Sequence, residues 1–375
     1  MASNRCYNYV VIGAGVAGCS VSYELSKRGN KNILLIDKNS GVSQGASGAA
    51  GAFLSPLLGK PNLLKELVSN ALRYTTKLYQ NNFNFVISNC GTTRIPKNEQ
   101  DEEKFKQYVP YMDFPYIKDD KGYFFSIGTV VSSIGMCKAM STCFSSATSK
   151  IETKFDCEIK TIEYDGEFWY LDNNIKTKKL IITTGASIDL LNQFYLNIRA
   201  VWGRRIDITT STNLTHNYHK SCSVSKSFKI AEDKYRVSIG ATHHRKYENV
   251  LDIQKENELL LQRANEIVDL KDIEIIKEYL GARACSIDYF PIVGKIIDSE
   301  KTIKDFPHLK NGTYVNKDRF TRFDNLYMLN GLGGRGFVLA PYLAKQLVDN
   351  IIDNKPLDDT ITPDRLFIRE VKRMK

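Results

Sequence analysis

The segment 9–38, YVVIGAGVAGCSVSYELSKRGNKNILLIDK, constrains the fold of this chain more than any other part of the sequence. An apolar run is followed by three glycines in the G-x-G-x-x-G spacing, then by a helical pattern and a second apolar run. A carboxylate, Asp37, stands at the end of that second run. This order is typical of a βαβ unit that binds a dinucleotide. The three glycines are Gly13, Gly15 and Gly18.

Each part of this segment has a separate predicted task. Gly13 makes the tight turn, Gly15 lets the backbone approach a pyrophosphate, and Gly18 lets the helix lie close to the strand. The helix predicted over 16–27 directs its N-terminal N–H groups at the phosphates. After the strand predicted over 33–36, Asp37 is placed to accept the ribose hydroxyls.

Two further glycine loops belong with the first one. The loop 43–51, SQGASGAAG, lets backbone amides come close to a phosphate or a flavin ring. The apolar run 326–330 leads into the loop 331–336, GLGGRG, and a helix is predicted from about Ala340 to Ile352 with Pro341 in its first turn. A helix N-terminus beside a cation suits the pyrimidine edge of a flavin, so the three loops together imply FAD.

The middle of the chain predicts a hairpin and a buried strand. Alternating segments over 158–162 and 168–171 meet at a turn around Asp165-Gly166. The apolar run 179–182 then leads to Thr184 and Gly185, where the strand is expected to return to the cofactor. The residues predicted to bind the cofactor are Gly13, Ala14, Gly15, Val16, Ala17, Gly18, Asp37, Lys38, Gly45, Ala46, Ser47, Gly48, Ile159, Thr184, Gly185, Gly333, Gly334, Arg335, Gly336 and Phe337.

Composition limits the class of protein without naming a partner. With 375 residues, the chain is expected to form two interleaved domains. Its 52 Lys plus Arg against 42 Asp plus Glu give a net charge of +10, which favours an anionic partner, although the basic residues form no single block. The eight cysteines are scattered, and His243 and His244 are strand neighbours that face opposite ways, so neither a disulfide framework nor a metal site is expected.

No targeting or membrane segment is predicted. The first nine residues are polar, and no run approaches the ~18 apolar residues that a membrane span needs. We therefore expect a cytoplasmic protein.

Three segments resemble a known family. The chain is similar to the D-amino-acid-oxidase-like FAD superfamily, which includes glycine and sarcosine oxidases. Within it, the chain most resembles the FAD-dependent C-terminal half of the bifunctional tRNA 5-methylaminomethyl-2-thiouridine biosynthesis proteins, the MnmC type. The matching residues are Gly45-Ala46-Ser47-Gly48, Gly51, Ser55-Pro56-Leu57-Leu58, Gly281, Arg283, Asp288, Pro291, Val293, Gly294, Gly331-Leu332-Gly333-Gly334-Arg335-Gly336 and Ala340-Pro341-Tyr342. Gly334 replaces a family serine, and Trp202-Gly203-Arg204 replaces an R-G-Q segment.

The resemblance implies an α/β fold in two parts. The first is a glutathione-reductase-type Rossmann domain for non-covalently bound FAD, built from residues 1–50, 130–195 and 282–360. The second is a smaller α+β substrate domain with an antiparallel sheet, built from residues 51–129 and 196–281.

The resemblance also implies a reaction. The enzyme would oxidise the carboxymethylaminomethyl group of wobble uridine in tRNA, release glyoxylate and leave aminomethyluridine. Since no methyltransferase half precedes the first glycine turn, a separate methyltransferase is an expected partner. Arg283 matches the position at which glycine oxidases bind the substrate carboxylate, and Arg335 is the second candidate for ring or substrate. No His, Asp or Glu stands out as a general base, and Cys285 is expected to be a structural thiol.

An anticodon loop needs a basic entrance to the flavin pocket. The predicted entrance residues are Trp202, Arg204, Arg205, His244, Arg245 and Lys246, where bases would stack on aromatic or guanidinium planes. Two rival interpretations remain: an oxidase or dehydrogenase of free glycine, sarcosine or a D-amino acid, and a flavoprotein that binds tRNA or a membrane without turnover.

Overall fold

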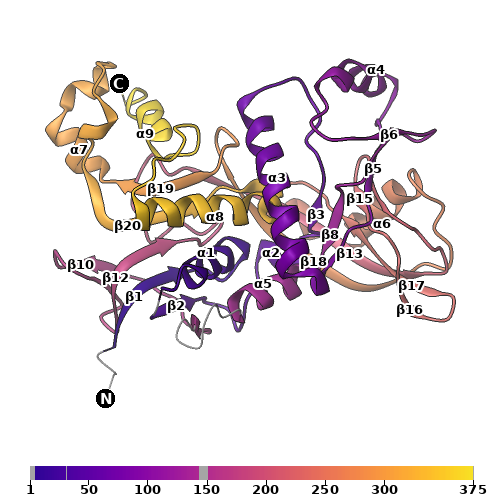
Figure 1. Cartoon of the computed structure of the whole chain (residues 1–375), viewed down its shortest axis with the longest axis horizontal. Coiled ribbons are helices and arrows are strands. Elements are labelled where there is room, and N and C mark those ends of the chain that lie inside the picture. The colour runs from indigo at the N-terminus through magenta and orange to yellow at the C-terminus, as the bar shows by residue number, and fades with distance from the viewer. Residues whose placement is uncertain (1–4, 31, 143–150, 375) are drawn as a thin grey trace.

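Two main sheets lie on opposite sides of the molecule, with helices packed around each of them (Figure 1). The computed structural model describes residues 5–30, 32–142 and 151–374. Its helices are α1 (Val16–Lys27), α2 (Ala46–Ala49), α3 (Leu63–Asn82), α4 (Glu99–Tyr108), α5 (Ser133–Thr142), α6 (Ile253–Asn265), α7 (Ser299–Asp305), α8 (Gly336–Asp353) and α9 (Asp364–Val371).

The first sheet is built around four parallel pairings of strands. Its described strands are β1 (Cys6–Ile12), β2 (Ile33–Ile36), β9 (Ile151–Lys154), β10 (Ile162–Tyr164), β11 (Trp169–Leu171), β12 (Ile175–Ile182), β19 (Ile292–Ile297) and β20 (Arg322–Asn330). β1 lies between β2 and β12, β2 pairs with β9, and β12 pairs with β20, all in parallel. β10 and β11 form the predicted hairpin around Asp165-Gly166, but its first strand is Ile162–Tyr164 and not the predicted 158–162. Helices α1, α3 and α8 cover one face of the sheet.

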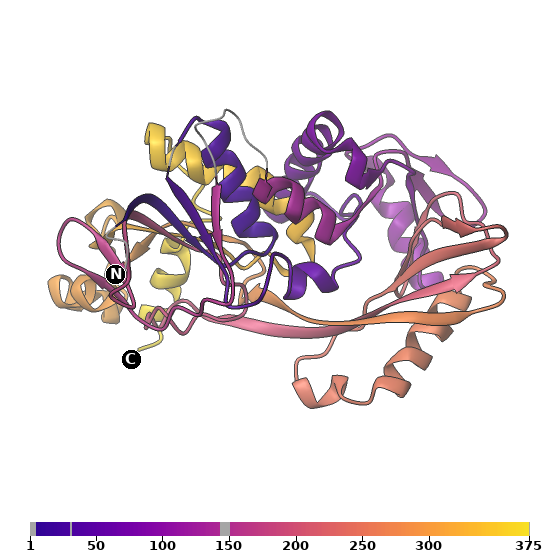
Figure 2. The same cartoon turned by 90° about the horizontal axis from the view of Figure 1, so that it is seen from below.

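The second sheet is mostly antiparallel. Its described strands are β5 (Thr92–Arg94), β6 (Ile117–Lys118), β7 (Tyr123–Phe125), β13 (Ile198–Thr210), β14 (Asn217–His219), β15 (Ser223–Val224), β16 (Phe228–Ala231), β17 (Lys234–Gly240) and β18 (Glu274–Ser286). Helix α6 packs its apolar side on this sheet. Figure 2 shows β13 and β18 as two long strands that run side by side between the two halves of the molecule. A small third sheet contains β3 (Phe53–Leu54), β4 (Ile87–Ser88) and β8 (Thr129–Val131).

The predicted fold class is confirmed, since a parallel sheet with helices stands beside a second, mostly antiparallel sheet. The division into two domains stays a prediction. Helix α3 belongs to the segment 51–129, and it packs its apolar side against α8 from the segment 282–360.

The predicted start of the last glycine-loop helix was wrong. Helix α8 begins at Gly336 rather than near Ala340, so Pro341 lies inside the helix and not in its first turn. A proline there cannot donate to the carbonyl four residues earlier. The structure satisfies that carbonyl from outside, because the Tyr79 hydroxyl of α3 donates to Phe337 O at 3.0 Å.

The described cysteines are free thiols. No helix in the described ranges has the length and apolar character that a membrane span requires.

Candidate functional site

A large cavity of about 980 Å³ lies between the two main sheets. Its walls come from the glycine turn after β1, the loop that contains α2, the turn after β12, the strands β13 and β18, and the loop before α8. This volume lies at the upper end of the range that small-molecule and cofactor sites usually occupy. Segments far apart in the sequence therefore share one site large enough for an extended ligand.

The glycine turn after β1 is shaped by backbone contacts. Gly13 has a φ of +105°, and a Cβ there would lie 2.5 Å from the Thr183 carbonyl oxygen. A Cβ on Gly18 would lie 1.9 Å from the Gly13 carbonyl oxygen. Gly18 thus lets α1 begin directly against the turn, as its predicted task requires.

Two side chains hold the helix N-terminus in place. Ser47 Oγ accepts a hydrogen bond from Val16 N at 2.9 Å, and Asp37 Oδ2 accepts one from Ala14 N at 2.6 Å. A Cβ on Gly15 would lie 3.1 Å from Ser47 Oγ, so glycine at this position leaves room for the Ser47 side chain at the helix end. The N-terminus of α1 thus lies at the cavity wall, where the nucleotide motif predicts the phosphates.

Most of the predicted cofactor residues line the cavity. Those that do so are Gly13, Gly15, Val16, Ala17, Asp37, Lys38, Gly45, Ala46, Ser47, Ile159, Thr184, Gly185, Gly333, Gly334, Arg335, Gly336 and Phe337. Ala14, Gly18 and Gly48 do not line it. A Cβ on Gly48 would lie 1.9 Å from Ser43 O, so Gly48, like Gly18, allows close backbone packing behind the cavity wall.

Arg283 extends from β18 into the opposite end of the cavity. Its Nη1 donates to the Thr242 carbonyl oxygen at 3.2 Å, and a Cβ on Gly203 would lie 2.6 Å from the same nitrogen. Burial lowers the pKa of Arg283 below its usual value. No carboxylate lies within 4.0 Å of this guanidinium among the described residues. Arg283 therefore presents an uncompensated, forked donor to any anion in the cavity.

Arg335 lies in the loop before α8, close to the same end of the cavity. Burial lowers its pKa, and it too has no ion-pair partner in the part of the chain that the structure describes. A Cβ on its neighbour Gly334 would contact Arg283 Cδ at 3.7 Å. The family serine that Gly334 replaces would therefore bring a hydroxyl close to Arg283.

The cavity residues that the sequence analysis missed include Arg94 on β5, His219 on β14 and His243 after β17. Burial lowers the pKa of His243 to about 4, and the charge of Arg283 adds to this lowering. Burial also lowers the pKa of His219, with the charge of Arg94 as the next cause. Both imidazoles are thus neutral near pH 7. No spacing pattern in the sequence connects these residues, since they meet only through the second sheet.

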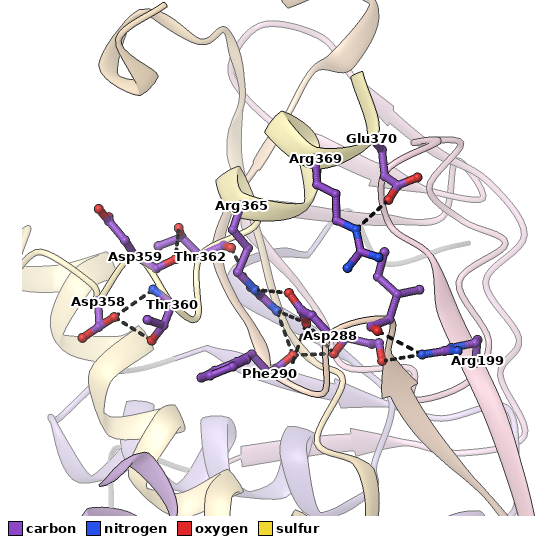
Figure 3. Close-up of polar contacts among 12 residues, drawn as sticks. Arg199, Asp288, Phe290, Asp358, Asp359, Thr360, Thr362, Arg365, Arg369 and Glu370 are labelled. Carbon is purple, nitrogen blue, oxygen red and sulfur yellow. Dashed lines mark hydrogen bonds and ion pairs between the residues drawn. The ribbon is translucent and has the colours of Figure 1, made fainter. Parts of the chain in front are cut away.

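Asp288, from the D-x-x-P part of the family motif, has a structural task outside the cavity (Figure 3). Its two carboxylate oxygens accept hydrogen bonds from Arg365 Nε at 2.8 Å and Nη2 at 3.1 Å. Arg365 also donates to the carbonyls of Phe290 and Thr362. Burial by itself would raise the pKa of Asp288, but the hydrogen bond and charge of Arg365 outweigh it and hold the pKa below its usual value. The ion pair between Asp288 and Arg365 links α9 to the turn after β18, the strand that carries Arg283.

The predicted basic entrance was partly wrong. Arg204 and Arg205 are only 8% and 6% exposed. Arg204 Nε donates to Val250 O at 2.6 Å, and Arg205 pairs with Asp207 at 2.7 Å beneath the ring of Tyr279. Both side chains are buried in the second sheet, where each has a local partner that the sequence does not reveal.

Other predicted entrance residues lie where they could be reached. Trp202 lines the cavity, and its ring lies 4.6 Å from that of Tyr247, measured between centroids. Arg245 and Lys246 are exposed. His244 instead interacts with Glu256 at 2.9 Å. Cys285 is half-buried and does not line the cavity, and burial raises the pKa of its thiol.

The comparisons with known proteins agree with this geometry. Residues 8–350 match the family described as FAD dependent oxidoreductase, and the chain belongs to that family. The whole chain is 23% identical to the tRNA 5-methylaminomethyl-2-thiouridine biosynthesis bifunctional protein MnmC of Vibrio campbellii, of which the match covers 61%. With the protein of the same name from Campylobacter fetus it is 22% identical over 97% of this chain and 60% of the relative. The chain thus spans about three-fifths of the curated relatives that it matches.

Solved structures share the fold. The glycine oxidase of Bacillus cereus superposes with a TM-score of 0.73 at 19% identity, over 93% of this chain and 96% of that one. The iminodiacetate oxidase of Chelativorans superposes with a TM-score of 0.70 at 16% identity, over 95% and 99% of the two chains.

The cavity fits the cofactor of the family. The N-terminus of α1 at the cavity wall, the glycine turns and a volume of about 980 Å³ suit a long dinucleotide with a flat ring. The prediction of an FAD-dependent oxidoreductase is confirmed by the family match.

Proposed function

We propose that this protein oxidises the carboxymethylaminomethyl group on the wobble uridine of tRNA, with FAD as the oxidant. One observation carries this proposal: the match to the bifunctional tRNA-modifying relatives runs from end to end of this chain. The unpaired Arg283 in the cavity supports it, because the substrate group ends in an N-substituted glycine whose carboxylate needs a cationic partner.

When bound, the flavin supplies the two-electron oxidation by accepting a hydride from the carbon between the substrate nitrogen and carboxylate. The oxidised C–N bond is an imine, and water splits it into glyoxylate and an aminomethyl group that stays on the uridine. The protein's part is to bind, orient and exclude competing reactions. Arg283 would hold the carboxylate through two parallel N–H bonds, which fix both its position and its angle.

The substrate amine has to lose a proton before it can give up hydride. The neutral His243 lies beside Arg283, but its pKa of about 4 makes it a weak base. We therefore assign the proton to solvent and not to a residue of this chain. In this proposal His243 serves as an uncharged wall of the carboxylate site.

The entrance to the cavity would receive the anticodon loop. We propose that Trp202 and Tyr247 stack against a base, while the exposed Arg245 and Lys246 contact phosphates. These four residues replace the entrance predicted from the sequence, which contained Arg204 and Arg205. A methyltransferase on a separate chain and a cytoplasmic location remain parts of the proposal.

Anaerobic mixing of the FAD-loaded protein with tRNA that carries the carboxymethylaminomethyl group tests the function. We expect the flavin absorbance to bleach, with one glyoxylate formed per flavin and a matching mass loss in the nucleoside. Unmodified tRNA is the control. Bleaching by glycine, sarcosine or D-alanine, but not by the modified tRNA, would establish the rival function as a free amino-acid oxidase, the class to which the glycine oxidase fold likeness points.

A further inference from the structure

Arg94 is a third arginine that lines the cavity, and it comes from the second sheet. It ends β5 in the second sheet, directly opposite His219 on the parallel neighbour β14. Both side chains line the cavity. Arg283 and Arg335 reach the same cavity from β18 and from the loop before α8. The second sheet therefore supplies a cation to the face of the cavity opposite the glycine turns.

Most of the donors of Arg94 are unused. Its Nη1 donates to Ser55 Oγ at 3.3 Å and to Pro56 O at 3.0 Å. Its Nε is buried without a hydrogen-bond partner, and Nη2 bonds to none of the described residues. A buried donor without a partner costs free energy, so its retention indicates a ligand.

The charge of Arg94 is also uncompensated. Across the described ranges no carboxylate lies within 4.0 Å of it. Burial, and secondly the positive charge of Arg335, lower the pKa of Arg94 to about 9. Arg94 and Arg335 are thus close enough to repel each other inside the protein. Such an arrangement is unfavourable until an anion lies between or beside them.

Arg283 belongs to a different position in the same cavity. Its guanidinium lies against Thr242 O and Gly203, whereas the guanidinium of Arg94 donates to Ser55 and Pro56. We propose that Arg94 and Arg335 form a second anion subsite, separate from Arg283, which binds a second oxyanion of the substrate. This inference rests on the proposed function, since Arg283 is taken to hold the carboxylate next to the oxidised carbon. The substrate class is then an N-substituted glycine with a further carboxylate or phosphate.

The flavin is the other candidate occupant, and the structure argues against it for Arg94. The pyrimidine edge of the ring would be served by the N-terminus of α8, which begins at Gly336 in the loop that lines the cavity. Arg94 comes from the second sheet and is held by the Ser55-Pro56 segment.

Two matched ligand pairs test the subsite on the FAD-loaded protein. Methoxyacetate and diglycolate share an ether and one carboxylate, and diglycolate adds a second carboxylate. Uridine and uridine 5′-monophosphate differ by a phosphate. Dissociation constants come from the ligand-induced change in flavin absorbance and from calorimetry. The variants are Arg94→Gln, Arg94→Lys and Arg283→Gln, with Arg236→Gln as the control because Arg236 is an exposed arginine of the same sheet.

We expect the wild-type protein to bind the dianion or the nucleotide at least about tenfold more tightly than its partner. Arg94→Gln should abolish this preference and leave methoxyacetate binding within about twofold, Arg94→Lys should restore part of it, and Arg236→Gln should change nothing. The ligand pair that shows the preference identifies the second oxyanion as a carboxylate or a phosphate.

Each of three outcomes would overturn a different part of the proposal. If Arg94→Gln keeps the full preference, or if the wild type shows none for either pair, the subsite is wrong. If Arg94→Gln shifts the flavin midpoint potential while the preference stays, Arg94 serves the flavin. If Arg283→Gln leaves methoxyacetate affinity unchanged while the phosphate preference still depends on Arg94, the subsite stands and the proposed chemistry at Arg283 fails.

Discussion

The two ends of the cavity differ in the groups that they offer to a ligand. At the nucleotide end, backbone N–H groups, glycines and three acidic residues line the wall, and each of these acids follows a strand of the first sheet: Asp37, Glu158 and Asp189. At the other end lie three guanidiniums without ion-pair partners among the described residues: Arg94, Arg283 and Arg335. A ligand at the first end is recognised by close backbone approach, and a ligand at the second end by its charge.

The comparison teaches which changes each end tolerates. A site made of backbone fails when any side chain enters it, whereas a site made of charge fails when a charge is removed.

The largest effect is expected at Gly18. In Gly18→Val the new Cβ would lie 1.9 Å from Gly13 O and 2.7 Å from Thr183 Oγ1. Either α1 or the turn has to move, so we expect loss of bound FAD and a destabilisation of about 3 kcal/mol or more. The ratio of flavin to protein absorbance and urea unfolding measure both quantities.

Gly41→Ala is the control, because the nearest atom to a Cβ at that position is Gln44 Nε2 at 3.7 Å. A Gly18→Val protein that keeps a full complement of FAD would show that backbone approach does not govern the nucleotide end.

Arg283→Gln tests the charged end. Removing a buried cation from a carboxylate costs about 2 to 4 kcal/mol, so we expect kcat/KM to fall about 30- to 1,000-fold while FAD stays bound. Anaerobic stopped-flow reduction of the flavin measures the rate. Arg236→Gln removes an exposed arginine of the same sheet and should leave the rate unchanged. An equal loss in both variants would point to overall charge in place of a specific contact.

Asp288→Ala tests whether the motif beside Arg283 is structural. Loss of the two hydrogen bonds to Arg365 should cost about 2 kcal/mol in the free energy of unfolding. Because the folded-state pKa of Asp288 lies below its unfolded value, its contribution is present above about pH 4 and is lost as the pH falls through the folded-state pKa. Variant and wild type should therefore converge in stability in acid.

Urea unfolding at several pH values measures this difference. Asp324→Ala removes a partner of Lys295 that is 66% exposed, and it should cost about 0 to 1 kcal/mol. If Asp288→Ala costs no more than this control, the contact in Figure 3 does not stabilise the C-terminal helix.

The smallest effect is expected at His243. Because the pKa of His243 is lowered to about 4, the imidazole is uncharged between pH 5 and 8, and His243→Gln should change kcat/KM by less than about threefold there. Its stability contribution is complete above about pH 6.5 and is lost as the pH falls toward 4, so the variant should be less sensitive to acid. A wild-type rate that falls with an apparent pKa near 6.5, and a variant rate that does not, would instead make His243 the base.

The nucleotide end could be predicted from the sequence because its physics is local. Helix α1 and strand β2 have the predicted bounds, since a glycine spacing between two apolar runs specifies strand, turn and helix over fewer than forty residues. Helix α8 shows the limit of this reasoning. Its start depends on Tyr79, from a distant helix, which satisfies the carbonyl that Pro341 leaves free.

The family, the cofactor and the loops that approach it could be predicted from the chain alone, because they depend on glycines whose spacing is visible along it. Which arginines are free to bind a ligand depends on how the chain folds. Arg205 pairs with Asp207 inside the second sheet. Arg94 ends a three-residue strand and reaches the cavity with its Nε unbonded and with no carboxylate partner among the described residues. An arginine has the same charge in both settings, and its availability depends on which carbonyls and carboxylates the folded chain places around it.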